Sequence, residues 1–180
     1  LQAEDRSRAG LARIHALMMN EDTEARTAEQ MQLDLQMLGS WVFVSSDLDD
    51  INIGVQTLKK NLDQTLPLLE ERLLHPKFTT AAFDRIKKQA LEGFKSRQAQ
   101  PGTVATEVFA KLNQGRDSIL GVSQSGTEET VKNLTLKDVE DYHARFITSR
   151  GAKLVVVGDV TQKEILGRLG FLAKLPDREI

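Results

Sequence analysis

The spacing of apolar residues along this chain is helical almost everywhere and changes to a strand-like pattern in only three short runs. Side chains that recur every three or four residues, as on the buried face of an amphipathic helix, occupy the stretches 8–19, 27–38, 59–74, 80–99, 103–113 and 135–146. Short apolar runs typical of strands occupy 41–46, 51–57 and 153–157. Helices and strands in this order predict the α+β class, with an antiparallel or mixed sheet covered on one face by helices.

Local signals fix several of the expected boundaries. Thr27 and Gln30 have the spacing of a capping box, so a helix should begin there, and Gly39 should end it. The aspartates of 47–50 form a turn between two apolar runs, which predicts a hairpin whose buried face includes Ile51, Ile53 and Val55. Thr161, with a glutamate three residues later, should cap the last helix.

Charge and cysteine content exclude several classes of function. Lys and Arg number 24 and Asp and Glu 26, for a formal net charge of −2, which gives no electrostatic footprint for nucleic acid or an anionic membrane. No apolar run reaches the length that a membrane span needs. The chain has no Cys, which excludes disulfides, thiolate metal sites and Cys nucleophiles.

Size and strand count predict one domain over 1–180 that belongs to a longer protein. The 180 residues suffice for one sizeable domain, and composition does not change along them. The first residue is not Met, and three strands are few for so many helices. We therefore expect a fragment whose sheet has an unpaired edge, with self-association as one consequence.

The residues alone show no catalytic constellation. His15, His75 and His143 are the only histidines, and no two of them have the spacing of a local metal-ligand pair. We expect His15 to be partly buried or at the rim of its helix's apolar stripe and His143 to be half-exposed, both in structural roles. The Asp47–Asp50 run lacks the glycine and the distal glutamate of a calcium loop.

One segment resembles the pitrilysin/insulinase family of zinc peptidases. Residues 10–23, GLARIHALMMNEDT, are similar to the family's inverted zinc-motif helix. Weaker matches follow in the family's order as far as about Leu172, at LGS (38–40), LLHPKF (73–78), GTEE (126–129), LTLKD (134–138) and VVVGD (155–159). The resemblance implies the metallopeptidase-repeat fold of the mitochondrial processing peptidase.

The departures from the motif decide what the resemblance implies for chemistry. Arg13 and Leu17 occupy the positions of the two zinc histidines, and Ala16 occupies that of the catalytic glutamate. Arg13 is always protonated, Leu17 has no donor atom and Ala16 cannot accept a proton. Glu92 lies near the place of the third ligand, where we expect a solvated helix residue. No catalytic, cofactor or metal site is therefore expected here, and Leu17 should be a core residue beside Leu11, Ile14 and Met18.

The resemblance then implies a noncatalytic repeat that helps to enclose a peptide substrate, in a hydrolase whose zinc is held by another repeat. Its partners would be the other repeats and the peptide, and its location the periplasm or cell envelope of a bacterium. Two alternatives remain. One is a structural subunit like the core proteins of the mitochondrial respiratory complex, and the other is a processing partner whose catalytic chain is separate.

Overall fold

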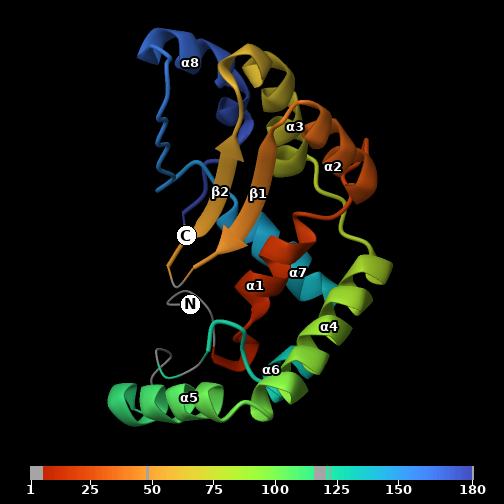
Figure 1. The fold of residues 1–180 in the computed structure, drawn as a ribbon, viewed down its shortest axis with the longest axis vertical. Coiled ribbons are helices and arrows are strands. Elements are labelled where there is room, and N and C mark those ends of the chain that lie inside the picture. Colours follow the sequence, from red (N-terminus) through yellow and green to blue (C-terminus); the bar gives the residue numbers. More distant parts are fainter. Residues whose placement is uncertain (1–5, 48, 116–120, 122, 180) are drawn as a thin grey trace. The chain divides into compact units, whose positions relative to one another are not determined.

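The computed structural model describes residues 6–47, 49–115, 121 and 123–179, with the elements labelled in Figure 1. The helices are α1 (Leu11–Met18), α2 (Ala28–Met37), α3 (Leu62–Leu74), α4 (Thr80–Gln98), α5 (Pro101–Gln114), α6 (Glu128–Asn133), α7 (Leu136–Phe146) and α8 (Gln162–Arg168). Short 3-10 turns lie at Arg6–Arg8, Lys59–Asn61 and Gly170–Lys174. The strands β1 (Trp41–Ser46) and β2 (Ile51–Gln56) form a two-stranded antiparallel sheet, so the predicted α+β class is confirmed.

The chain divides into two compact units. Unit 1 comprises Leu1–Met18, Ser45–Asn52 and Phe78–Tyr142, and unit 2 comprises Met19–Val44, Ile53–Lys77 and His143–Ile180. Both units are therefore assembled from segments far apart in the sequence. The prediction of a single domain over 1–180 concerns the repeat as a whole and stays a prediction.

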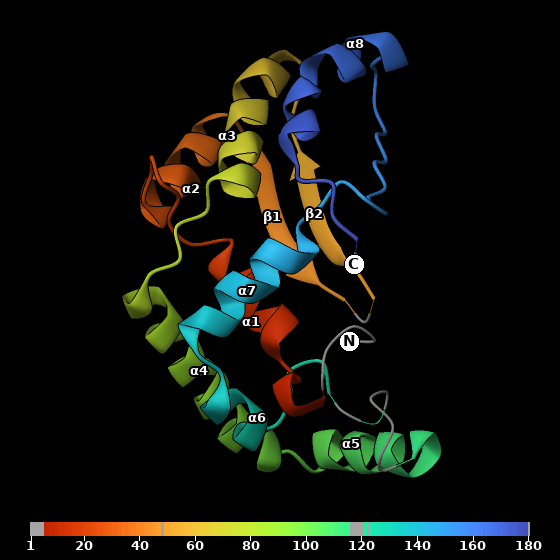
Figure 2. The same ribbon diagram turned by 180° about the vertical axis from the view of Figure 1, so that it is seen from behind.

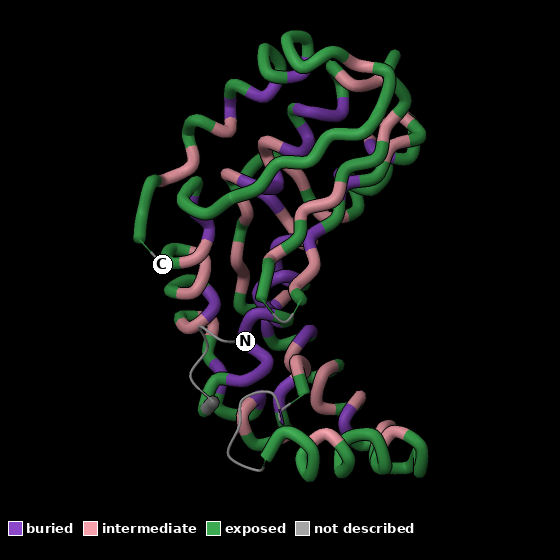
Figure 3. Tube along the Cα trace, turned by 90° about the vertical axis from the view of Figure 1, so that its left-hand side faces the viewer, coloured by how far each residue is buried: buried purple, intermediate pink, exposed green. Residues whose placement is uncertain are grey.

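The core of unit 1 is built on α1 and α4. Its buried residues come from α1, α4, the α6 region and the start of α7: Leu11, Ile14, Met18, Phe83, Ile86, Phe94, Val131, Leu134 and Val139. In Figure 2, α6 lies along α4, where Lys87 Nζ donates to the carbonyl oxygens of Lys132 and Leu134 at 2.8 and 2.7 Å. By contrast α5, which follows α4 after a short break, has no buried residue (Figure 3).

In unit 2, α2 packs against α3, and the unit also includes residues 41–44 of β1 and 53–56 of β2. Arg26 joins the helices, since its Nε donates to Asp34 Oδ2 on α2 at 2.9 Å and an Nη donates to Glu71 on α3. Val42 and Val44 of β1 are 2% and 1% exposed. The predicted buried face of β2 is only partly correct, because its isoleucines are half-buried and Val55 is 36% exposed.

The short-range predictions of helix boundaries are confirmed. The Thr27 hydroxyl accepts from the amide of Gln30, whose side chain accepts from the Thr27 amide in return. Gly39 ends this helix with a φ of 57°, a backbone conformation that glycine adopts most readily. Thr161 and Glu164 form the same kind of capping box at α8.

The prediction of a strand at 153–157 is wrong for the described structure. The segment is extended but unpaired, and Figure 1 draws it as coil. Leu154, Val155, Val156 and Val157 are 55%, 83%, 43% and 93% exposed. A run of β-branched residues favours an extended backbone, but a strand also needs a neighbour to receive its hydrogen bonds, and none is present in the described part of the chain.

Candidate functional site

The helix that matches the zinc motif presents two side chains to solvent. Within α1, every residue is buried except Arg13 and Leu17. These two are four residues apart, so they lie on the same helix face, one turn from each other. They are also the two positions that the resemblance to the zinc motif assigns to the zinc histidines. The helix therefore places two side chains one turn apart, as a two-histidine zinc motif does, but neither side chain has an atom that can bind the metal.

Glycine contacts fix how this helix begins. Gly10 precedes it with a φ of 100°, and its carbonyl accepts from the amide of Ile14. A Cβ at Gly10 would lie 2.8 Å from the carbonyl oxygen of Ser125, and one at Gly126 would lie 2.1 Å from that of Ala9. Only glycines permit so close an approach, which holds the start of α1 against the chain before α6.

The prediction that Leu17 is a core residue is wrong. Its side chain is 37% exposed, whereas Leu11, Ile14 and Met18 are at most 3% exposed. Leu17 follows Leu11 and Ile14 at three-residue intervals, which is why its spacing predicts a place in the apolar stripe. It lies on the same helix face as Arg13, however, and because the other residues of α1 are buried, this face is the exposed one. Ala16 is 3% exposed and therefore inside.

A zinc ion does not fit the residues present on this face. A guanidinium cannot ligate and Leu17 has no donor atom. Glu92 is exposed on α4, as expected of a solvated helix residue. Within the described residues, no group of three or more His, Asp or Glu side chains is arranged to hold a metal ion.

His15 is fully buried, which corrects the prediction of a partly buried or rim histidine. Its ring lies 5.0 Å from the Tyr142 ring and 6.0 Å from the Phe78 ring, tilted against both. This aromatic packing explains why a histidine beside the apolar stripe is retained in the core of unit 1.

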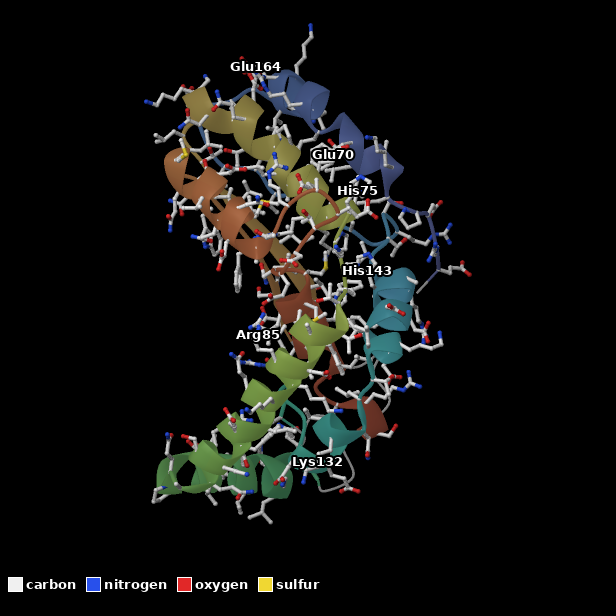
Figure 4. The ribbon with its side chains drawn as sticks, turned by 90° about the vertical axis from the view of Figure 1, so that its right-hand side faces the viewer. Glu70, His75, Arg85, Lys132, His143 and Glu164 are labelled. Carbon is white, nitrogen blue, oxygen red and sulfur yellow. The ribbon has the colours of Figure 1, made fainter. Side chains whose placement is uncertain are left out.

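The other two histidines are labelled in Figure 4. His75 Nδ1 lies 3.3 Å from a carboxylate oxygen of Glu24 in an exposed pair. His143, on α7, is half-buried as predicted. Burial, with a smaller contribution from the Arg178 charge, lowers the pKa of His143 to about 4, so its imidazole is neutral at pH 7.

One face of the hairpin carries a pair of aromatic side chains. The rings of Trp41 and Phe43 stack at 5.3 Å with an interplanar angle of 17°, and the side chains are 50% and 38% exposed. Gly54 on β2 makes room for them, since a Cβ there would lie 2.8 Å from the indole ring of Trp41. No motif marks these two residues in the sequence. The alternation of aromatic residues with Val42 and Val44 was the available signal, because alternate residues point to opposite faces.

None of the described helices is long and apolar enough to cross a bilayer.

Comparison with known proteins places the chain in a family. Residues 2–117 match the model of the insulinase family of peptidases, M16. A non-peptidase homolog from Helicobacter pylori, YmxG, is 25% identical over 165 residues, which are 92% of this chain and 38% of that protein. The chain thus spans well under half the length of this curated relative.

Solved structures agree on the fold. An M16 inactive domain from Pseudomonas fluorescens has a TM-score of 0.88 at 21% identity over 98% of this chain and 44% of that one. The periplasmic protease PqqL from Escherichia coli has a TM-score of 0.82 at 19% identity, over 98% of this chain and 20% of that one. Because the family model matches more than half of its residues, the chain belongs to the insulinase (M16) family of peptidases.

Proposed function

We propose that this chain is a wall of the peptide chamber in a zinc metallopeptidase whose metal is held by another repeat. The observation that carries the proposal is the exposed Trp41–Phe43 pair on the β1–β2 hairpin. Aromatic side chains offer large contact area for little loss of conformational freedom. Val42 and Val44, buried behind them, hold the pair in place without a ligand.

The absence of zinc-donor atoms at Arg13 and Leu17 on α1 favours a noncatalytic role for this chain. Metal analysis of the purified chain after dialysis against trace zinc should find far less than one zinc per chain. One tightly held zinc per chain, lost in Glu92→Gln or His15→Ala, would contradict the noncatalytic assignment. For the compartment we propose the periplasm or cell envelope, supported by the similarity in fold to the periplasmic PqqL.

The decisive experiment tests peptide contact in the parent protein. Trp41→Ala combined with Phe43→Ala should raise KM for peptide hydrolysis about tenfold, the effect of losing roughly 1.4 kcal/mol of binding, with kcat and zinc content unchanged. A matched control replaces Leu33, 59% exposed on α2, with Ala. A KM that responds equally to both variants would rule out specific contact.

A second role, a structural or adaptor subunit outside proteolysis, is favoured by the name of the Helicobacter pylori relative, a non-peptidase homolog. The two roles differ in one result. If the zinc-bearing repeat cleaves peptides equally well with and without this chain, the chamber role fails and the structural role stands.

A further inference from the structure

The outer edge of β1, the edge that does not face β2, is occupied at Val44 by a side chain. Asn20 Nδ2 donates to the Val44 carbonyl oxygen at 2.7 Å, and the Val44 amide donates to Asn20 Oδ1 at 3.0 Å. One carboxamide therefore supplies both bonds that a paired residue of a neighbouring antiparallel strand would supply.

Arg72 reinforces the contact from α3. One of its Nη groups donates to the carbonyl oxygen of Val42 and also lies 3.4 Å from Asn20 Oδ1. Arg72 is 5% exposed and Val44 is 1% exposed. Two successive outward positions of β1 are thus bonded to side chains, of which Arg72 is buried and Asn20 half-buried.

The Asn20 and Arg72 side chains matter because a strand edge with unpaired backbone groups binds extended polypeptides. Unpaired amides and carbonyls along an edge receive peptides by strand addition and cause edge-to-edge aggregation, and natural sheets cover or interrupt such edges. On β1 the interruption comes from a residue three positions after Leu17, in the same segment that matches the zinc motif.

We propose that Asn20, held by Arg72, takes the place of a neighbouring strand and closes the outer edge of β1 to extended polypeptides. Strand addition by a peptide or by a second copy is thereby prevented at this edge. The inference does not depend on the chamber role, since the bonds to Val44 exist whatever the parent protein does.

The test compares Asn20→Ala with the unaltered chain. The probe is a fluorescent, lysine-flanked peptide containing the sequence of β1, WVFVSS. Asn20→Ala should bind it about tenfold more tightly, and the Val44 amide should exchange with solvent about tenfold faster. A peptide N-methylated on alternate residues, which cannot donate to an edge, should not bind more tightly.

Two further variants make the result decisive. Asn52→Ala removes an exposed carboxamide of the same hairpin, bonded to Asp47 Oδ2 at 3.1 Å, and should leave peptide binding unchanged. If Asn20→Ala does not fold, Asn20→Asp retains the acceptor for the Val44 amide but offers its carbonyl no donor, and it should still bind the peptide more tightly. Folded Asn20 variants that bind no more peptide than the unaltered chain would overturn the proposal.

Discussion

The segments 41–46 and 153–157 have nearly the same kind of sequence and quite different structures. WVFV and LVVV both favour an extended backbone. The first is β1, with Val44 at 1% exposure, and the second is unpaired coil with Val157 at 93%. β1 is followed at once by a turn and its partner, with the Asp47 amide donating to the Asp50 carbonyl at 2.8 Å. The difference lies in the neighbours, so residue type alone does not make a strand.

The largest test of this contrast places the same charge in both segments. Val44→Asp would bury an unpaired carboxylate and should cost about 4 kcal/mol or more of unfolding free energy. Val157→Asp, at an exposed site, should change it by no more than about 0.5 kcal/mol. Urea denaturation followed by circular dichroism measures both. Equal losses would mean that 153–157 is packed as tightly as β1.

The next largest effect is expected from acid, which should destabilise the chain around His143 before it affects β1. The unfolded chain binds a proton on this side chain near pH 6.5, whereas the lowered pKa means that the folded chain binds it only near pH 4. Between these values the unfolded state holds more protons, so stability present above pH 6.5 is lost as the pH falls, by at most about 3 kcal/mol. Unfolding curves at pH 7 and 4.5 should show the loss, and His143→Gln should reduce it.

The same experiment can be read segment by segment. His143 is on α7, which precedes the 153–157 segment. An Nη group of Arg178 donates to the carbonyl oxygen of the adjacent Ala144. Hydrogen exchange at pH 4.5 should therefore rise over 143–150 before it rises in β1. The opposite order would place the acid-sensitive group elsewhere.

Features that depend on adjacent residues could be predicted from the sequence, and features that depend on distant ones could not. The capping box at Thr27 and the hairpin turn each lie within a few residues, and both are confirmed. The exposure of Leu17 depends on which parts of the chain surround α1. The bond from Arg72 to Val42 spans 30 residues. At the candidate site, the motif located Arg13 and Leu17 correctly on one helix, while the aromatic pair had no motif to mark it.

Self-association gives a third test. We expect any dimer of this chain to form through 153–157 rather than through β1, because Asn20 and Arg72 occupy the outer edge of β1. Val155→Lys combined with Val157→Lys should weaken dimerisation about tenfold in sedimentation equilibrium, equivalent to about 1.4 kcal/mol. Leu33→Lys on α2 is the control. Equal weakening by the control would show a general effect of charge.

The smallest expected effect concerns how 153–157 is anchored. Arg150 pairs with Asp177 at 3.0 Å and Glu179 at 2.9 Å, but these side chains are 50%, 68% and 88% exposed. Exposed ion pairs contribute little because water screens them and their side chains lose freedom, so Arg150→Ala should cost no more than about 0.5 kcal/mol.

The neighbouring Thr148 provides the matched comparison. It is 8% exposed, and its hydroxyl donates to the Pro176 carbonyl at 2.8 Å and accepts from the Arg178 amide at 3.0 Å. Thr148→Val keeps the shape and leaves those backbone groups without this partner, which should cost about 1–3 kcal/mol. Denaturation midpoints in low and high salt distinguish the two contributions, because only the Arg150 effect should shrink with salt. If Arg150→Ala lowers the free energy of unfolding more than Thr148→Val does, ion pairs rather than buried hydrogen bonds stabilise the chain that precedes 153–157.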